Sequence, residues 1–234
     1  MSTQREVVVL SGVRTAIGDY GGGLKDVPPS ELAATVIREA VKRAKVEPQK
    51  VGQLVLGNVI HTEAKDMYIS RVACIKGGLP QDTTALTVNR LCGSGLQAIV
   101  SAAQSITLGD TDVAVGGGVE SMSRIGIGAS GGAWPVDPSI ALKSYYLPQG
   151  VSADLIATKH GFTRDEVDAY AVESQQRASA SWRSGHFGRS VVPVGDVNGL
   201  TILDRDEHMR PDATMQSLGA LKPSFAEMGE TYGF

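Results

Sequence analysis

The sequence predicts an α/β fold in which a mostly parallel sheet is flanked by helices. Short apolar runs of strand length alternate with longer segments whose apolar residues recur at helical spacing. The short runs are nearly continuous in hydrophobicity, as in parallel sheets that are covered on both faces. Glycine makes up 28 of the 234 residues, above the ordinary share of about 7%, which favours tight packing between elements and functional turns.

The first half of the chain alternates regularly between the two kinds of segment. An apolar run that ends at Gly12 predicts a buried strand over residues 6–13. A helix is expected to begin at residues 28–31, with Ser30 as its N-cap, and to continue to Ala44. The further strands are predicted over 53–60, 84–89 and 112–115, the last running into Gly116–Gly118, and the further helices over 66–75 and 93–108.

The character of the sequence changes at Ser123. Residues 125–150 are rich in Gly, Pro and Ser and lack periodicity, which predicts a long excursion loop. Thr163 and Glu166 have the spacing of a capping box at the start of a helix that ends near Gly185, and short strands are expected over 191–194 and 200–203. We therefore expect two parts, an α/β domain over 1–122 and a loop or cap region with a return segment over 123–234.

Composition excludes several classes of protein. The net charge is −3 and no basic stripe occurs, so no nucleic-acid partner is expected. No window approaches ~18 uninterrupted apolar residues, so no membrane span is expected. Two cysteines cannot form a disulfide framework, no His/Cys cluster has metal-ligand spacing, and the N-terminal residues do not resemble a signal peptide. We expect a cytoplasmic protein without a bound metal or organic cofactor.

The segment Asn89-Arg-Leu-Cys-Gly-Ser-Gly95 lies between a predicted strand and a predicted helix. Cys92 would sit at a helix N-terminus, where outward-pointing N–H groups and the helix dipole favour a thiolate. The neighbouring glycines leave room for an electrophile, and backbone N–H groups there can stabilise an oxyanion. The arrangement is that of a nucleophile elbow with sulfur in place of oxygen. The alternative is a small cysteine buried at the start of the helix.

Two other patterns are better explained without a site. The acidic residues at 165, 166, 168 and 173 lie on one predicted helix and indicate a solvated face that complements the helix dipole. Gly21-Gly-Gly23 is followed by no Lys-Ser/Thr pair, so it does not have the pattern of a phosphate-binding loop.

The segment Asn89–Ala98 closely resembles the nucleophile segment of the thiolases, which comprise acetyl-CoA acetyltransferases and 3-ketoacyl-CoA thiolases. Further segments are similar to thiolase segments in the same order: Val13–Gly18, Gly57–Val59, Gly116–Ser123, Arg164–Ala171, Asp206–Arg210 and Leu221–Phe225. The resemblance extends from Glu6 to Phe225 and implies a thiolase-like half fold with an inserted loop domain. It also makes the buried-cysteine alternative for Cys92 much weaker.

The resemblance implies acyl-CoA C-acyl transfer of the beta-ketothiolase type, a reaction of fatty acid metabolism. Cys92 would accept the acyl group from a CoA thioester, and free CoA or a second thioester's enolate would then take it. Arg210 and Phe225 match positions where the family holds CoA, and Ser217 lines the same groove. Taken alone, Arg210 would more simply be a solvated charge. The resemblance implies acyl-CoA and CoA as ligands and a homo-oligomer as the assembly.

The sequence also departs from the family pattern. It contains no Gly-His-Pro turn, no second cysteine in a Gly-rich turn and no Gly-Asn-Ala-Ser-type turn. None of its histidines, at 61, 160, 186 and 208, occupies the expected context, and Pro148-Gln-Gly150 stands where many thiolases have His-Met-Gly. Three hypotheses remain: a thiolase whose catalytic set is incomplete in this chain, a non-catalytic thiolase-like module that binds CoA or assembles, and an acyltransferase half complemented by another chain. Acyl chain length, reaction direction and pathway stay open.

Overall fold

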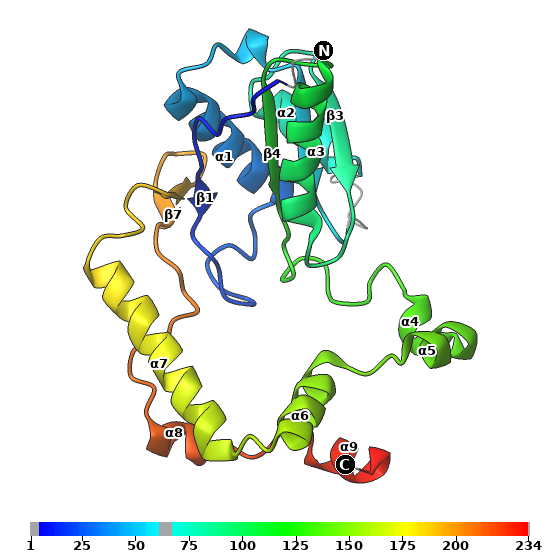
Figure 1. Ribbon diagram of the computed structural model, residues 1–234. Helices are drawn as coiled ribbons and strands as arrows, with labels where there is room; N and C mark the ends of the chain where they lie inside the picture. Colours follow the sequence, from blue (N-terminus) through cyan, green and yellow to red (C-terminus); the bar gives the residue numbers. More distant parts are fainter. Residues whose placement is uncertain (1–4, 61–66, 234) are drawn as a thin grey trace. The chain divides into compact units, whose positions relative to one another are not determined.

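The computed structural model describes residues 5–60 and 67–233 and divides the chain into two compact units. The first unit comprises residues up to Ser130 together with Gly188–His208, and the second comprises Gly131–Phe187 with Met209–Phe234. The division at 122/123 expected from composition stays a prediction. Figure 1 shows the course of the chain through the elements of both units.

A three-stranded parallel sheet forms the centre of the first unit. Its strands are β2 (Gln53–Gly57), β3 (Thr84–Val88) and β4 (Ala114–Gly118), in the order β3-β2-β4. Gln53 aligns with Thr84 on one side and with Ala114 on the other. The observed strands differ by a few residues from the ranges predicted for them, 53–60, 84–89 and 112–115. The predicted alternation of strands and helices between residues 29 and 118 is correct.

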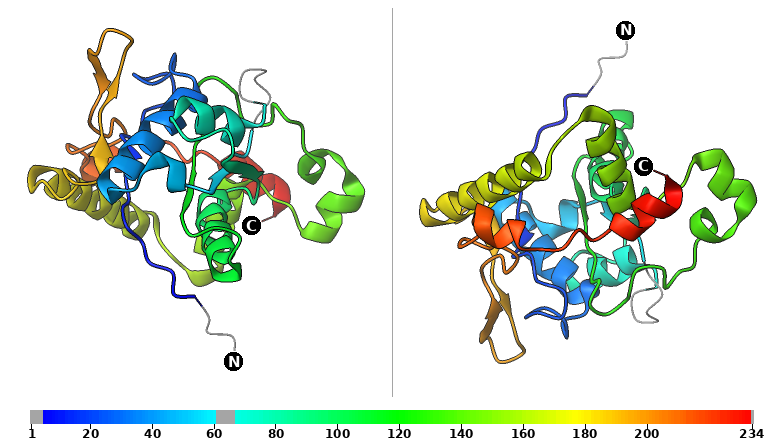
Figure 2. Two further views of the ribbon diagram at one scale, coloured as in Figure 1. Left: turned by 90° about the horizontal axis from the view of Figure 1, so that it is seen from above. Right: turned by 90° about the horizontal axis from the view of Figure 1, so that it is seen from below.

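Helices cover the sheet on both faces. Leu54 and Leu56 of β2 are buried against α1 (Pro29–Ala44) and α2 (Ile69–Lys76), whereas Val55 between them is buried against α3 (Ser94–Leu108). Successive side chains of a strand point to opposite faces, so β2 is buried on both sides. This explains its continuous apolar run. Figure 2 shows α1 and α2 on one side of the sheet and α3 on the other.

The helix ends differ in part from the predictions. Gly109 ends α3 in a left-handed conformation, as expected. Ser30 is not the N-cap of α1: Pro28 occupies that position, makes no side-chain cap, and Ser30 is buried inside the helix. The start expected for α2 at Asp66 lies outside the described residues.

The strand predicted over residues 6–13 is wrong. The observed strand β1 is Arg14–Thr15 alone, and it pairs in parallel with β5 (Val191–Val192). Residues 7–10 are exposed, Val9 to 86%. They lie along a cavity of about 1040 Å³ that α1, α3 and β4 also line. An apolar run forms a strand only beside a partner edge, and within the described residues this run has none.

The return segment of the first unit is a short hairpin. β6 (Val194–Gly195) pairs antiparallel with β7 (Thr201–Leu203), so the single strand expected over 191–194 is divided between β5 and β6. Asp196 Oδ1 accepts hydrogen bonds from the N–H groups of Asn198 and Leu200 and thereby closes the turn.

The second unit is helical throughout its described elements. Its helices are α4 (Ala133–Val136), α5 (Pro138–Ser144), α6 (Gln149–His160), α7 (Arg164–Arg183), α8 (Met215–Gly219) and α9 (Ala226–Tyr232). The predicted capping box at Thr163 and Glu166 is confirmed. The hydrogen bonds from Thr163 also hold the pKa of Glu166 below its ordinary value. The excursion expected to lack structure contains two short helices, α4 and α5. Asp137 caps α5 by accepting from Ser139 N–H.

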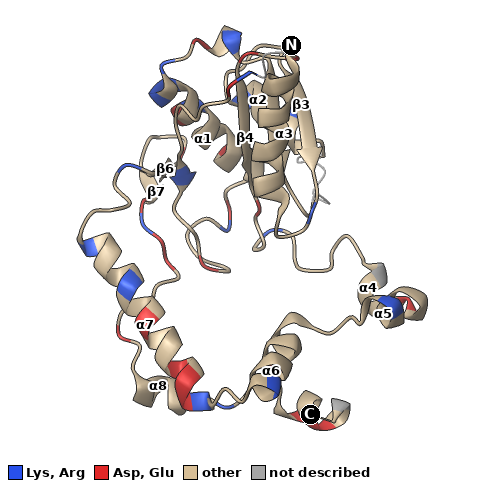
Figure 3. Cartoon of the chain, in the orientation of Figure 1, with Lys and Arg blue, Asp and Glu red and all other residues tan. Residues whose placement is uncertain are grey.

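Helix α3 is unusual because its outer side is apolar and uncharged. It contains no Lys, Arg, Asp or Glu (Figure 3). Leu96 and Leu108 are exposed to 68% and 78%, and Ile99 and Val100 are also exposed. Among the described residues, α3 and the three residues before it form one stretch, 91–108, that is long and apolar enough to cross a membrane by length and composition alone. The inner side of α3 packs on the sheet, where Ala98 and Ala102 are buried beside Val55.

We expect this 234-residue polypeptide to associate through the outer side of α3, because a large uncharged apolar face drives association. Sedimentation at low micromolar concentration should show species heavier than 24.5 kDa. The double variant Leu96→Lys/Val100→Lys should shift the population toward monomer, and Leu142→Lys on α5, another exposed leucine, should not. A clean monomer of the unmodified chain would contradict the expectation.

Candidate active site

The candidate site lies at the carboxyl edge of the three parallel strands, where open α/β sheets bind their ligands. Three turns leave the sheet there: Asn58 follows β2, Asn89 follows β3, and Glu120 lies just beyond β4. The turn after β3 carries Cys92 and leads directly into α3. Cys92 is exposed. The alternative of a cysteine buried at the helix start is therefore not what the structure shows.

Glycines in the sheet bring the start of α3 into direct contact with the strands. A Cβ placed on Gly57 would lie 2.5 Å from the carbonyl carbon of Ser94, and one on Gly116 would lie 2.8 Å from Ile99 Cα. Real Cβ atoms do not approach backbone so closely, so any side chain at either position would push the helix outward. The two glycines thus determine how near to the sheet the Cys92 turn can lie.

The turn before the helix is tight and strained. Leu91 has φ 48°, a left-handed conformation that costs an ordinary residue about 1–2 kcal/mol. Its N–H donates to Asn89 Oδ1 at 3.0 Å. Ser94 Oγ donates to the Leu91 carbonyl at 2.6 Å and accepts from Arg90 N–H at 2.8 Å. Side chains on both sides of Cys92 therefore fix the backbone that carries it.

Two of the N–H groups near Cys92 are already used inside the turn. Gly93 N–H donates to the Arg90 carbonyl at 3.0 Å, and Ser94 N–H donates to the Leu91 carbonyl at 3.0 Å. The expectation that the N–H groups around the thiol stabilise an oxyanion therefore does not extend to these two, because donation to a turn carbonyl directs each away from a ligand.

Cys74 differs from Cys92 in its exposure to solvent. It is fully buried in α2, among the core residues that α1 and β2 contribute. Burial raises the pKa of its thiol, which disfavours the reactive thiolate. The interpretation of Cys74 as a core residue is consistent with this position.

The three predicted CoA contacts lie in the second unit. Arg210 is exposed; its N–H donates to Gln175 Oε1 at 2.7 Å and its guanidinium donates to the Met209 carbonyl at 3.2 Å. Ser217 Oγ accepts from Thr214 N–H at 2.9 Å and donates to the Thr214 carbonyl, so its hydroxyl caps α8. The roles of these residues toward CoA stay predictions.

Phe225 and Arg164 hold helices of the second unit together. A Cβ on Gly150 would lie 2.1 Å from Phe225 Cε2, so the ring rests directly on the first turn of α6. Arg164 Nη2 donates to the carbonyls of Leu218 and Leu221 at 2.6 and 3.1 Å, which fastens α8 to α7. The same guanidinium pairs with Asp168 at 2.8 Å, so that carboxylate has a structural partner.

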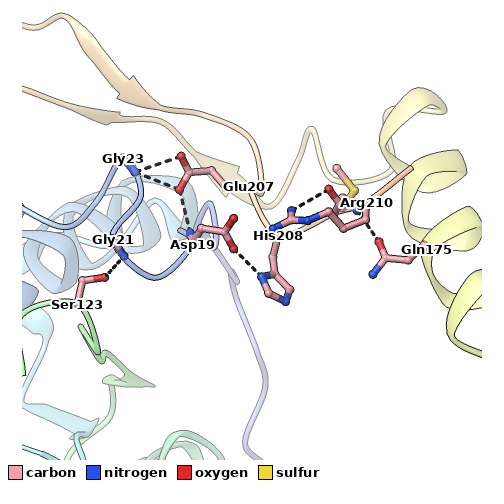
Figure 4. A network of polar contacts seen from close by, with 9 residues as sticks. Asp19, Gly21, Gly23, Ser123, Gln175, Glu207, His208 and Arg210 are labelled. Atoms are coloured by element: carbon pink, nitrogen blue, oxygen red, sulfur yellow. Dashed lines mark hydrogen bonds and ion pairs between the residues drawn. The ribbon is translucent and has the colours of Figure 1, made fainter. Parts of the chain in front are cut away.

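The glycine-rich loop at 21–23 holds a carboxylate of its own chain rather than a phosphate (Figure 4). Glu207 accepts from Asp19 N–H at 2.9 Å and from Gly23 N–H at 3.1 Å. Gly21 N–H donates to Ser123 Oγ at 2.9 Å, and His208 Nδ1 lies 2.6 Å from Asp19 Oδ1. This network joins the two chain segments of the first unit.

The histidines and acidic residues form no further site that the structure describes. His160 ends α6 with its ring 6.2 Å from that of Phe162, and His186 lies in the turn that follows α7. His61 lies outside the described residues. In residues 5–60 and 67–233, no group of three or more His, Cys, Asp or Glu side chains is arranged to hold a metal ion.

We expect iodoacetamide to alkylate Cys92 faster than Cys74 by more than about tenfold, because a buried thiol reacts only after local opening. Peptide mass spectrometry after a timed reaction with the folded protein measures both rates. In denaturant the two rates should converge. Equal rates in the folded protein would remove the argument for an accessible nucleophile at 92.

Comparisons with known proteins agree with this geometry. The family model for the thiolase N-terminal domain matches residues 7–232. Beta-ketothiolase BktB of Cupriavidus necator is 50% identical over 97% of this chain and 61% of its own, and an acetyl-CoA acetyltransferase of Chromobacterium violaceum is 39% identical over 96% and 61%. The crystal structure of human mitochondrial 3-ketoacyl-CoA thiolase in complex with CoA matches with a TM-score of 0.80 and 35% identity, over 93% of this chain and 57% of that one.

The chain thus spans about three-fifths of the length of the curated relatives it matches. The match extends over both units and includes every segment on which the resemblance was based. It confirms the predicted thiolase-like α/β half fold, and the chain belongs to the thiolase family, whose N-terminal domain it represents.

Proposed function

We propose that this chain carries the acyl-accepting part of a beta-ketothiolase-type acyl-CoA C-acyltransferase. The observation that supports this most strongly is the exposed Cys92 thiol, held on a strained turn at the carboxyl edge of the sheet and at the start of α3. The named relatives are thiolases and acetyl-CoA acetyltransferases. A nucleophilic sulfur is what such a reaction requires of its first half.

In the proposed step the Cys92 thiolate attacks the carbonyl carbon of an acyl-CoA thioester. A new carbon–sulfur bond forms to Cys92, the bond to the CoA sulfur breaks, and CoA leaves as a thiolate that takes up a proton. One thioester replaces another, so the acyl group stays activated. In condensation the enolate of a second acetyl-CoA then takes the acyl group and the Cys92 thiolate is released. In thiolytic cleavage Cys92 instead attacks the 3-keto carbon of a 3-ketoacyl-CoA, the bond between C2 and C3 breaks, and acetyl-CoA leaves once its enolate takes up a proton. Free CoA then takes the acyl group from Cys92 and the thiolate is released.

The CoA contacts form the second part of the proposal. Arg210 would pair with phosphate or stack on adenine, and Phe225 and Ser217 would lie along the pantetheine arm. CoA thioester is the substrate, and no metal or other cofactor is proposed. The solved relative that the chain matches is a complex with CoA, which supports this ligand.

The setting proposed for the protein is a homo-oligomer in the cytoplasm. The exposed apolar side of α3 supports an oligomer. Both cysteines are free thiols, and a nucleophilic thiol persists best in a reducing compartment.

Mixing the protein with acetyl-CoA should give an adduct of one acetyl group on Cys92, detected by intact mass and located by peptide mapping. Cys92→Ser should give no adduct, because a serine hydroxyl without a general base is a poor nucleophile at neutral pH. Cys74→Ala should be acetylated as the unmodified chain is. An adduct on the Cys92→Ser variant would mean that another residue holds the acyl group. No adduct on the unmodified chain would favour the non-catalytic CoA-binding module instead.

We also expect these 234 residues alone to show no steady-state turnover of a 3-ketoacyl-CoA with free CoA. Condensation and cleavage need a base at the carbon next to the thioester and donors for the enolate. The sequence contains neither the Gly-His-Pro turn nor the second cysteine of the family. A coupled thiolysis assay measures this, and turnover at the level of a complete thiolase would show that the missing groups are not required.

A further inference from the structure

We propose that Asn89 and Glu120 are positioning residues that hold the strained turn carrying Cys92. Neither side chain needs to touch the substrate. They act through the backbone of residues 58–60, which lies between them. Their importance for catalysis rests on the proposed function. Their effect on the reactivity of the Cys92 thiol can be measured without any CoA thioester.

The inference begins with the strain at Leu91. Its left-handed φ of 48° sets the direction in which the chain enters Cys92. The Leu91 side chain is 54% exposed, so packing contributes little to holding this conformation. Such strain persists only where surrounding contacts determine it. The contacts must therefore come from polar groups of the turn.

Asn89 supplies one of these contacts and is itself anchored at its other end. Its Oδ1 accepts from Leu91 N–H at 3.0 Å, and its Nδ2 donates to the Val59 carbonyl at 3.1 Å. Acceptor and donor face opposite partners, so rotating the amide by half a turn would break both hydrogen bonds. The side chain therefore bridges the Val59 carbonyl and the Leu91 N–H and fixes one relative to the other.

Glu120 holds the other side of Val59. One carboxylate oxygen accepts from Val59 N–H at 2.8 Å, and the other accepts from Ile60 N–H at 3.3 Å and from Asn58 Nδ2 at 3.3 Å. Asn58 is 2% exposed and also donates to the Val119 carbonyl at 3.0 Å. A charged acceptor on two consecutive amides keeps the segment 58–60 in one place.

The result is a continuous chain of hydrogen bonds across the ends of three strands. It runs from Glu120 beyond β4, through residues 58–60 after β2, to Asn89 after β3 and so to Leu91. Ser94 holds the Leu91 carbonyl from the helix side. With these contacts the turn keeps the Cys92 sulfur in one position beside the start of α3.

The test measures iodoacetamide alkylation of Cys92 at neutral pH. Asn89→Ala removes the hydrogen bonds to Val59 and Leu91 and should slow it by about 3- to 10-fold, the size expected for loss of the bond that holds the Leu91 amide. Glu120→Gln replaces one acceptor oxygen by an NH2 group and so leaves one of the two backbone N–H groups without an acceptor; it should slow alkylation by a smaller factor. The double variant should be less than additive, because both residues belong to one chain of contacts. Glu173→Gln, the same chemical change at an exposed ion pair on α7, is the matched control.

Glycine at position 91 distinguishes positioning from general support of the fold. Glycine adopts a positive φ without strain, so Leu91→Gly/Asn89→Ala should react at nearly the rate of Leu91→Gly. The buried Cys74 serves as an internal monitor, because its alkylation would rise if a variant opened the core.

The proposal is overturned if Asn89→Ala leaves Cys92 alkylation unchanged or makes it faster while Cys74 stays protected. It is also overturned if the loss persists in the Leu91→Gly background, or if Cys74 becomes reactive in parallel. A normal set of alkylation results without any acetyl adduct from acetyl-CoA would instead count against the proposed function alone.

Discussion

The contact between the backbone of α3 and the backbone of two sheet strands is the constraint on which the rest of the site depends. At Gly57 and Gly116 the helix approaches so closely that a single added carbon would overlap main-chain atoms of Ser94 or Ile99. No side-chain rotation can relieve an overlap between backbones. The helix, the sheet and the turn between them are therefore held closely together. The position of the Cys92 thiol on that turn is determined by where α3 packs on the sheet.

The sequence predicts the local part of this arrangement well and the long-range part poorly. The strands and helices between residues 29 and 118 are recognisable because each carries its own periodicity, and β2 is continuous in hydrophobicity because both faces are buried. The order β3-β2-β4 is not readable from spacing, since it joins segments about 30 and 60 residues apart. The prediction of a strand over 6–13 is wrong for the same reason. The apolar residues indicate that the segment favours burial, but they do not indicate the strand with which it would pair.

The candidate site shows the same division between local and long-range information. Cys92 could be found because the glycines around it form a local pattern between a strand and a helix. Asn58 and Glu120 were within recognised segments but had no local feature that sets them apart from surface polar residues. Only the parallel pairing of β2 with β4 brings the Glu120 carboxylate to the amides of Val59 and Ile60. Similarly, nothing in the sequence shows that the Ser217 hydroxyl caps its own helix.

The apolar outer side of α3 bears directly on the chemistry at its N-terminus. A helix dipole acts weakly on a charge in water and more strongly where water is excluded. Cys92 is exposed, and the same helix leaves Leu96 and Val100 uncovered within two turns of it. If the chain associates through this face, as we expect, the covering surface would also exclude water near the thiol. The proposed association and the proposed role of Cys92 would then depend on the same helix.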